Sequence, residues 1–161
     1  MKQEHSLDHV HIVLVADAKV AVLSHRGDPN LLDESIRKLV EWRKQNRLPP
    51  SVSATYNLLH DAPAGSAPSK YRLDVCVGTD SEVADNPFGV VASVIPGGRC
   101  AVLRHIGSDD HLGETLRFLR SVWLPQSGEE RRDFPLYLQR VHFPPFVPEH
   151  EAVTDVFLPI K

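Results

Sequence analysis

The seven residues AVLSHRG at positions 21–27 return almost unchanged as AVLRHIG at positions 101–107. An apolar rhythm alone suffices to make a strand, so a histidine and a glycine repeated at the same offsets need a further explanation. The match continues outward, with one residue inserted in the second copy between Leu119 and Trp123, through Leu32/Leu112, Glu34/Glu114, Arg37/Arg117, Leu39/Leu119, Trp42/Trp123, Tyr56/Tyr137 and Asp74/Asp155. Shared Gly, Trp, His, Arg and Tyr residues in one order indicate an internal duplication.

The first copy predicts a β-α-β-β unit. Residues 19–23 form a strand, and Gly27-Asp28-Pro29 supplies a turn, a helix N-cap and a proline suited to the first helical position. The helix that follows has an apolar stripe at Leu32, Ile36, Leu39 and Val40, with Arg43 among its polar faces, and Leu48-Pro49-Pro50 ends it. Strands are expected at 51–59 and 71–77, with a loop at 61–69 between them.

The second copy repeats this pattern. Its expected parts are a strand at 89–95, a hairpin turn at Pro96-Gly97-Gly98, a strand at 99–106, a cap at Ser108 or Asp109, a helix with Leu112, Leu116, Leu119 and Trp123 inward, and strands near 134–141 and 152–160. Residues 9–15 match 89–95 and are expected to form an extra first strand.

The duplication predicts an α+β fold. We expect tandem β-α-β-β units related by pseudo-two-fold symmetry, with antiparallel sheets, two main helices and a ligand cleft between the halves. A flexible N-terminus is expected at 1–8 and one domain at 9–161, with its repeats at 9–80 and 88–161.

Composition limits the classes of function. A chain of 161 residues with 42% hydrophobic content can bury a core as one domain. The net charge of −3, without a basic stripe, argues against direct nucleic-acid binding, and no apolar run is long enough to span a membrane. Cys76 and Cys100 lie in apolar runs typical of buried free thiols, which favours a reducing, cytoplasmic setting.

Symmetric pairs of polar and aromatic residues are the candidates for a binding site. Tyr56 and Tyr137, and Trp42 and Trp123, could stack on a flat ligand or hold a cation, although core packing is the alternative, favoured for the tryptophans. His105 and its counterpart His25 could contact a ligand, but histidines before a glycine more often hydrogen-bond a turn. Asp74 and Asp155 are expected to form structural ion pairs.

No residue is assigned a catalytic or metal-binding role, and no cofactor is expected. His9 and His11 alternate onto one strand face, but no third ligand stands at a recognisable metal spacing. Nucleophile elbows, phosphate-binding glycine loops and zinc-protease helix motifs are absent from the sequence.

Five phrases carry a resemblance to a known family: VAVLSHRGDPNLL (20–32), YRLDVCVGTD (71–80), IPGGRCAVLRHIGS (95–108), WLPQSGEE (123–130) and VPEHEAVTDVFLPIK (147–161). Over residues 9–161 the chain resembles the gyrase-inhibitor-like (GyrI-like) effector-binding domain, particularly the version attached to AraC-type transcriptional regulators. The resemblance implies a tandem fold with a central small-molecule site. It further implies cytoplasmic sensing of amphipathic or cationic compounds, including multidrug binding. In some members it implies inhibition of DNA gyrase or hydrolysis of cyclopropane toxins.

The chain departs from that family at one position. Many relatives have a glutamate two residues before the tyrosine of the penultimate strand, where this chain has Pro135 before Tyr137. An unpaired buried carboxylate is costly unless a cation compensates it, so its loss weakens the case for cationic ligands. Glu149 and Glu151 could supply a substitute carboxylate, although glutamates in loops are usually solvated.

Three functions therefore remain open. The first is a small-molecule sensor, either stand-alone or the effector half of a regulator whose helix-turn-helix DNA-binding domain is separate. The second is an interaction protein that docks on DNA gyrase, and the third is a small hydrolase of electrophilic toxins, which needs a carboxylate of raised pKa beside a tyrosine. The oligomeric state is not indicated by the sequence.

Overall fold

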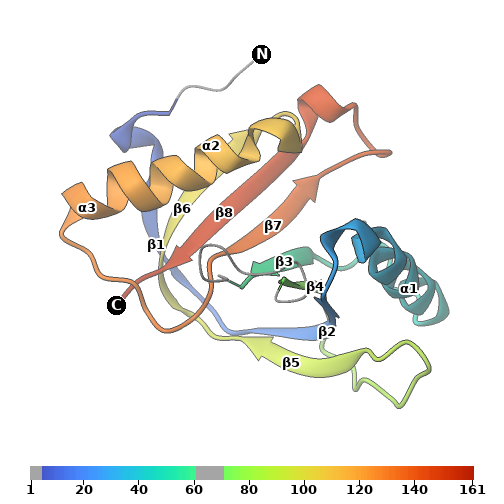
Figure 1. Cartoon of the computed structure of the whole chain (residues 1–161). Helices are drawn as coiled ribbons and strands as arrows, with labels where there is room; N and C mark the ends of the chain where they lie inside the picture. The colour runs from blue at the N-terminus through green and yellow to red at the C-terminus, as the bar shows by residue number, and fades with distance from the viewer. Residues whose placement is uncertain (1–4, 61–70) are drawn as a thin grey trace. The chain divides into compact units, whose positions relative to one another are not determined.

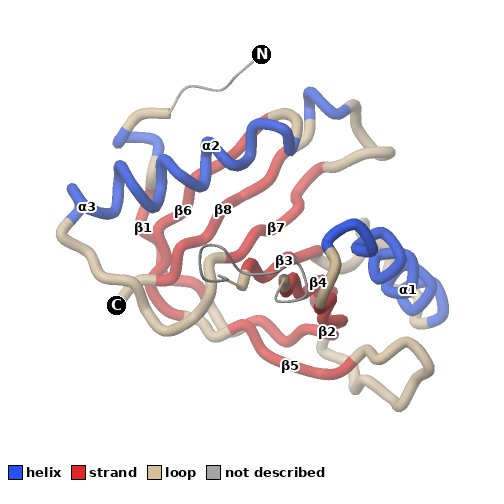
Figure 2. The backbone as a smooth tube through the Cα atoms, in the orientation of Figure 1, coloured by secondary structure: helices blue, strands red, loops and turns tan. Residues whose placement is uncertain are grey.

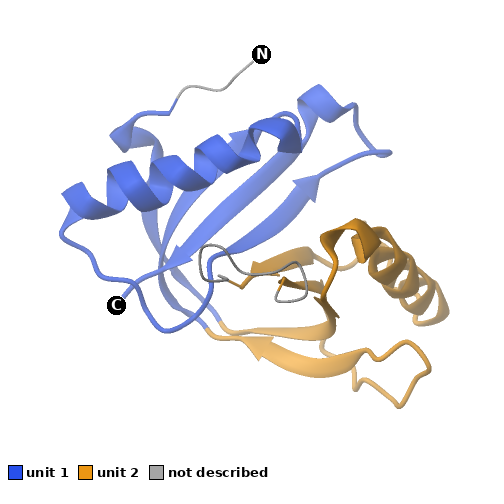
Figure 3. Ribbon diagram, viewed as in Figure 1, with its two compact units in different colours: residues 1–16, 97–161 blue, residues 17–96 orange. Residues whose placement is uncertain are grey.

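The computed structural model describes residues 5–60 and 71–161, and the chain divides into two compact units. Unit 1 is Met1–Ala16 with Gly97–Lys161, and unit 2 is Asp17–Pro96 (Figure 3). Each unit is an antiparallel sheet with one main helix, which confirms the duplicated α+β fold. The loop expected at 61–69 and the first four residues of the expected N-terminal segment lie outside the described residues.

Unit 2 contains the first main helix. Its elements are β2 (Ala18–Arg26), α1 (Leu32–Gln45), β3 (Thr55–Leu59), β4 (Arg72–Gly78) and β5 (Val91–Ile95), and its strand order is β3-β4-β2-β5 (Figure 1). Trp42 and Leu39 of α1 pack against apolar side chains of β2 and β4 in one buried core. Burial of these side chains removes apolar surface from water and attaches the helix to one face of the sheet.

Unit 1 has the same plan. Its elements are β1 (His11–Val15), β6 (Gly98–Ile106), α2 (Leu112–Arg117), a π-helical stretch (Phe118–Trp123), α3 (Leu124–Ser127), β7 (Tyr137–His142) and β8 (Val153–Pro159). The strand order is β1-β6-β8-β7. The three helical segments run on from one another as a single long helix along the sheet (Figure 2). Leu112, Leu119 and Trp123 are buried, as predicted, whereas Leu116 is only half-buried.

The first strand of each sequence repeat pairs with a strand of the other repeat, so each compact unit combines strands from both repeats. β1 pairs with β6, with His11 opposite Val102, and β5 pairs with β2, with Val91 opposite Val22. The hairpin turn predicted at Pro96-Gly97-Gly98 is therefore wrong, because β5 and β6 do not pair and the chain passes there from unit 2 into unit 1. Repeat boundaries of 9–80 and 88–161 remain a prediction about the sequence, since the compact units cross them.

The inward face of α1 differs from the predicted stripe. Ile36 and Val40 are 39% and 42% exposed, whereas Trp42 and Arg43 are buried together with Leu39. Arg43 is buried because the chain after the helix folds back around it. Its guanidinium donates to the carbonyl oxygens of Leu48 and Ser53 and to the hydroxyl of Thr55, at 2.7–2.8 Å.

Candidate functional site

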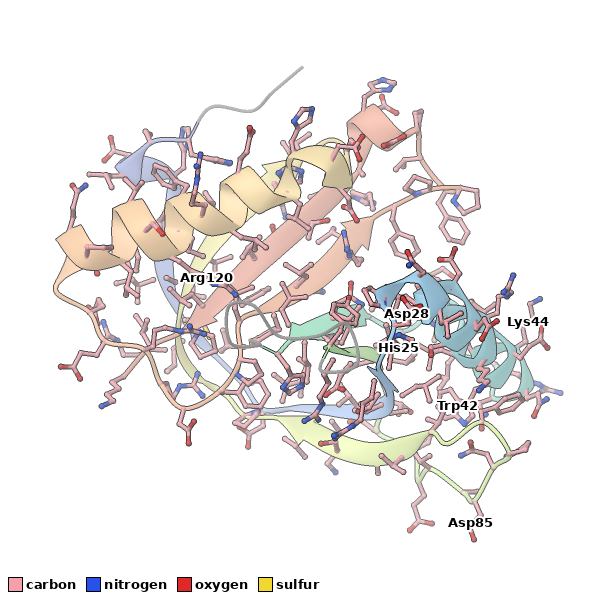
Figure 4. The ribbon with its side chains drawn as sticks, in the orientation of Figure 1. His25, Asp28, Trp42, Lys44, Asp85 and Arg120 are labelled. Carbon is pink, nitrogen blue, oxygen red and sulfur yellow. The ribbon has the colours of Figure 1, made fainter. Side chains whose placement is uncertain are left out.

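In each repeat, the histidine and the glycine lie where a strand connects to its helix. In unit 2, His25 and Asp28 lie close together at this connection (Figure 4). His25 Nε2 donates to the carbonyl oxygen of Asp28, and Nδ1 accepts from the hydroxyl of Ser35, both at 2.8 Å. A carbonyl oxygen can only accept, which assigns this tautomer. Gly27 between them has a φ of 102°, a conformation that suits glycine. The Asp28 side chain accepts from the backbone N–H of Asn30 and is the predicted cap.

Unit 1 repeats this connection and extends it. His105 Nε2 donates to the carbonyl oxygen of Ser108 at 2.9 Å, its Nδ1 accepts from the Thr115 hydroxyl at 2.8 Å, and Gly107 has a φ of 115°. His5 Nε2 lies 2.8 Å from the same hydroxyl oxygen. Because the single hydroxyl hydrogen is given to His105, His5 must donate. This geometry supports the interpretation of both strand-end histidines as turn-binding residues, and a ligand role for His105 stays a prediction.

His5 is the one member of this chain of hydrogen bonds with an incomplete shell. Among the described residues its buried Nδ1 atom has no hydrogen-bond partner. Burial lowers the pKa of His5, the charges of His105 and His9 lower it further, and the charge of Glu114 opposes them. Docking of the N-terminal segment therefore favours the neutral imidazole.

The two tryptophans lie on the helices. Trp42 is 4% exposed and Trp123 is 8% exposed. Trp42 belongs to the core of unit 2 between α1 and the sheet. This placement agrees with the core interpretation that the sequence favours, and a ligand contact by either tryptophan stays a prediction.

The two tyrosines lie on the opposite sheet faces from their helices. In unit 2, Leu73, Val75 and Val77 face the helix, so Asp74 and Cys76 face away, and Tyr56 lies directly opposite Cys76. We call this side of each sheet the helix-distal face. In unit 2 it comprises Val20, Val22, Ser24, Arg26, Tyr56, Leu58, His60, Arg72, Asp74 and Cys76, and in unit 1 Cys100, Val102, Arg104, Tyr137, Gln139, Asp155 and Phe157.

Asp74 is the centre of a polar cluster on the helix-distal face of unit 2. Its Oδ1 accepts from Ser24 Oγ and Arg72 Nε, and its Oδ2 accepts from His60 Nε2 and Arg72 Nη2. Burial alone raises the pKa of Asp74, but the hydrogen bonds from Ser24, His60 and Arg72 lower it by more, so the net direction is downward. The predicted structural ion pair is confirmed, with a guanidinium that binds in a bidentate manner.

Aromatic residues dominate the helix-distal face of unit 1. The Tyr137 ring stacks on Phe157 with centroids 4.8 Å apart, and its hydroxyl oxygen lies 3.9 Å from Cys100 Sγ. Asp155 accepts two hydrogen bonds from Arg104, which confirms the second predicted ion pair. Tyr137 is only 2% exposed, so its ring face is not open to solvent in this structure.

The carboxylate that the family resemblance implies two residues before the tyrosine of β7 is replaced by a proline in this chain. Pro135 lies in the loop before β7, and Glu149 is exposed, where it accepts a hydrogen bond from the hydroxyl of Ser108. The Ser108 side chain also accepts from the backbone N–H of Asp110, so Ser108, not Asp109, is the helix cap. Glu149 thus supports a helix cap, and its role as a ligand carboxylate stays a prediction.

Sequence reasoning missed the partners of Asp74 and the role of Arg43. Ser24, His60 and Arg72 surround Asp74 from β2, the end of β3 and β4, and the alternation of each strand could have placed them on one face. The sequence did not reveal the strand register that brings them together. Both cysteines are buried free thiols, as predicted, and burial raises the pKa of each.

No group of three or more His, Cys, Asp or Glu side chains in residues 5–60 and 71–161 is arranged to hold a metal ion. Over the same residues, no helix is both long and apolar enough to cross a membrane. The ligand cleft expected between the two halves stays a prediction.

Two α+β units with matched tyrosines and ion-paired carboxylates on their helix-distal faces define a duplicated binding domain. The chain belongs to the GyrI-like family, because the family model described as "GyrI-like small molecule binding domain" matches residues 9–161. The resemblance that the sequence motifs indicate is thereby confirmed.

Relatives with known names give the family a context. The chain is 36% identical to the "Probable transcriptional regulator YgiV" of Escherichia coli (strain K12), over 94% of this chain and 95% of the relative. Its fold resembles the C-terminal domain of EcmrR, with a TM-score of 0.75, 15% identity and coverage of 94% of this chain and 96% of that one. It also resembles SAV2435 bound to tetraphenylphosphonium, with a TM-score of 0.60, 7% identity and coverage of 94% and 93%. None of these three is described as AraC-type, so attachment to an AraC-type regulator is not shown.

Proposed function

We propose that this protein is a cytoplasmic sensor of a small organic molecule that acts in transcription regulation, as an effector domain or as a stand-alone sensor. The observation that carries the proposal is the 36% identity to a probable transcriptional regulator over 94% of the chain. The match of the family model to residues 9–161 supports the ligand-binding part. A ligand that favours one arrangement of the protein shifts its population, and a DNA-binding partner responds to that shift.

The ligand contacts that we propose are the helix-distal faces around Tyr56 and Tyr137. Tyr56 is half-buried, and burial raises the pKa of its hydroxyl, so this group stays protonated and can donate a hydrogen bond. An aromatic ring with a polar tip is suited to bind a flat organic molecule.

The two alternative functions have less support. A hydrolase of electrophilic toxins needs a carboxylate of raised pKa beside a tyrosine, whereas the pKa of Asp74, near Tyr56, is lowered. For a gyrase inhibitor, the support is the family name alone, because the family description gives small-molecule binding and the relative is called a probable transcriptional regulator.

Thermal-shift titration tests the proposal. A panel of planar aromatic anions, cations and neutral compounds is titrated against the purified chain, since a ligand at ~100 times its Kd adds about 2.7 kcal/mol of stability. We expect at least one class to raise the Tm, with a smaller rise in Tyr56→Ala. The same compound should change transcription in cells that carry the protein and leave it unchanged in cells that carry Tyr56→Ala. A panel without any Tm shift would contradict the proposal.

A further inference from the structure

Asp74 has no capacity left for a cationic ligand. Each of its two oxygens accepts two hydrogen bonds, from Ser24, His60 and Arg72, which uses the lone-pair positions of a carboxylate. Its side chain is only 4% exposed, whereas those of His60 and Arg72 are 25% and 35% exposed. The exposed part of the cluster therefore belongs to the side chains of His60 and Arg72 and not to the carboxylate of Asp74.

A second arginine lies on this face beside the cluster. Arg26 on β2 is directly opposite Arg72 on β4, and it is exposed. Two like charges directly opposite each other in a sheet destabilise it. The only carboxylate on this face within the described residues of unit 2 is Asp74, so two guanidinium groups face one carboxylate. The excess positive charge favours an anion from outside.

Arg72 has donors to spare for such an anion. Its Nε and one Nη2 hydrogen bind Asp74, and the hydrogens of Nη1 have no acceptor among the described residues. Asp74 holds the guanidinium in place, so little side-chain freedom is lost when a second anion binds. Tyr56 lies two positions from Leu58, the residue paired with Asp74, and on the same face, where it can contact the apolar part of a ligand.

We propose that Arg72 and Arg26 form an anion subsite on the helix-distal face of unit 2 and that the ligand is an aromatic carboxylic acid packed beside Tyr56. This inference rests on the proposed sensor function and specifies its ligand class. In unit 1, the carboxylate of Asp155 is likewise bound by Arg104.

Calorimetric titration with three probes of one shape tests the subsite: naphthoate, naphthylmethanol and naphthylmethylammonium. We expect naphthoate to bind most tightly, naphthylmethanol less tightly and naphthylmethylammonium least. Naphthoate should bind about ten-fold or more tighter than the ammonium probe, because a charge-assisted hydrogen bond contributes at least that much affinity. Added salt should weaken naphthoate binding and leave naphthylmethanol binding unchanged. Binding of the ammonium probe as tightly as naphthoate overturns the anion subsite while it supports the sensor. Failure of all three probes to bind overturns the anion subsite, whereas the sensor function is contradicted only if the thermal-shift panel also gives no Tm shift.

Three arginine variants locate the subsite. Arg72→Gln should weaken naphthoate about ten-fold and change naphthylmethanol little, and Arg26→Gln should weaken naphthoate by a smaller factor, about three-fold, because it lacks the support of Asp74. Arg26→Gln keeps every contact of Asp74, so it remains informative if Arg72→Gln folds poorly. Arg37→Gln on the exposed side of α1 is the matched control and should leave all affinities unchanged. Equal naphthoate affinity in wild type and Arg26→Gln overturns the inference, whether or not Arg72→Gln folds.

Discussion

Thr115 and Ser35 occupy the same position in the two repeats but hold different numbers of hydrogen bonds. Thr115 is 1% exposed and bonds both His105 and His5, whereas Ser35 is half-buried and bonds only His25 among the described residues. Thr115→Val keeps the shape and removes both bonds, leaving a buried donor and a buried acceptor unsatisfied. At about 1–3 kcal/mol for each of the two groups, we expect a loss of about 2–6 kcal/mol in the free energy of unfolding.

Ser35→Ala should cost less, about 1 kcal/mol, because one bond is lost and water can reach the site. Urea unfolding followed by circular dichroism gives both values from the midpoint and the slope. His5→Ala should lower the cost of Thr115→Val, since one of its two bonds is then already gone. The assigned hydrogen bonds would be refuted if Thr115→Val and Ser35→Ala lowered the free energy of unfolding equally. They would also be refuted if Thr115→Val cost the same in the His5→Ala background as in the wild type.

Three further changes follow from the described contacts. Arg43→Met should lower the free energy of unfolding by about 3–5 kcal/mol in urea unfolding, because it leaves the carbonyls of Leu48 and Ser53 without their donors, whereas Arg37→Met on the solvent side should change it by less than ~0.5 kcal/mol. Gly107→Ala should lower the Tm, since its φ of 115° disfavours a Cβ. Gly113→Ala in α2 should raise the Tm, because nothing lies within 4 Å of the added Cβ. A higher Tm for Gly107→Ala or a lower Tm for Gly113→Ala would refute the backbone argument. Because the pKa of His5 is lowered from 6.5, the docked segment binds fewer protons than the free one, so docking is strongest above pH 6.5 and weakens as the pH falls below it. Hydrogen exchange at residues 6–9 should therefore accelerate from pH 7.5 to pH 5.5, after correction for intrinsic rates, and His5→Ala should abolish the change.

Local signals in the sequence were sufficient for most elements. Gly27 and Gly107 end their strands, and Asp28 and Ser108 cap the helical segments that follow, because backbone conformation and capping depend on neighbours within a few residues. The ion pairs of Asp74 and Asp155 were also predictable in kind, since a carboxylate inside a strand needs a cation nearby.

Long-range choices were not predictable in the same way. β1 and β5 are equivalent in the two repeats, so pairing β1 with β2 or with β6 uses equivalent residues, and periodicity cannot distinguish the two. Arg43 looks like a solvent-facing residue until the carbonyls of Leu48 and Ser53 fold around it. The cluster around Asp74 likewise depends on the register between β2, β3 and β4.

The crossing of β1 and β5 has a consequence for synthesis on the ribosome. All strands of unit 2 lie in the continuous stretch Asp17–Pro96, so that unit can close before β6 to β8 have left the ribosome. β1 is made first but stays unpaired until residues 98–102 of β6 have been made. A nascent chain that stalls after unit 2 has closed and before β6 is made carries an unpaired, aggregation-prone strand. This interval is the one in which chaperone binding would protect the chain most.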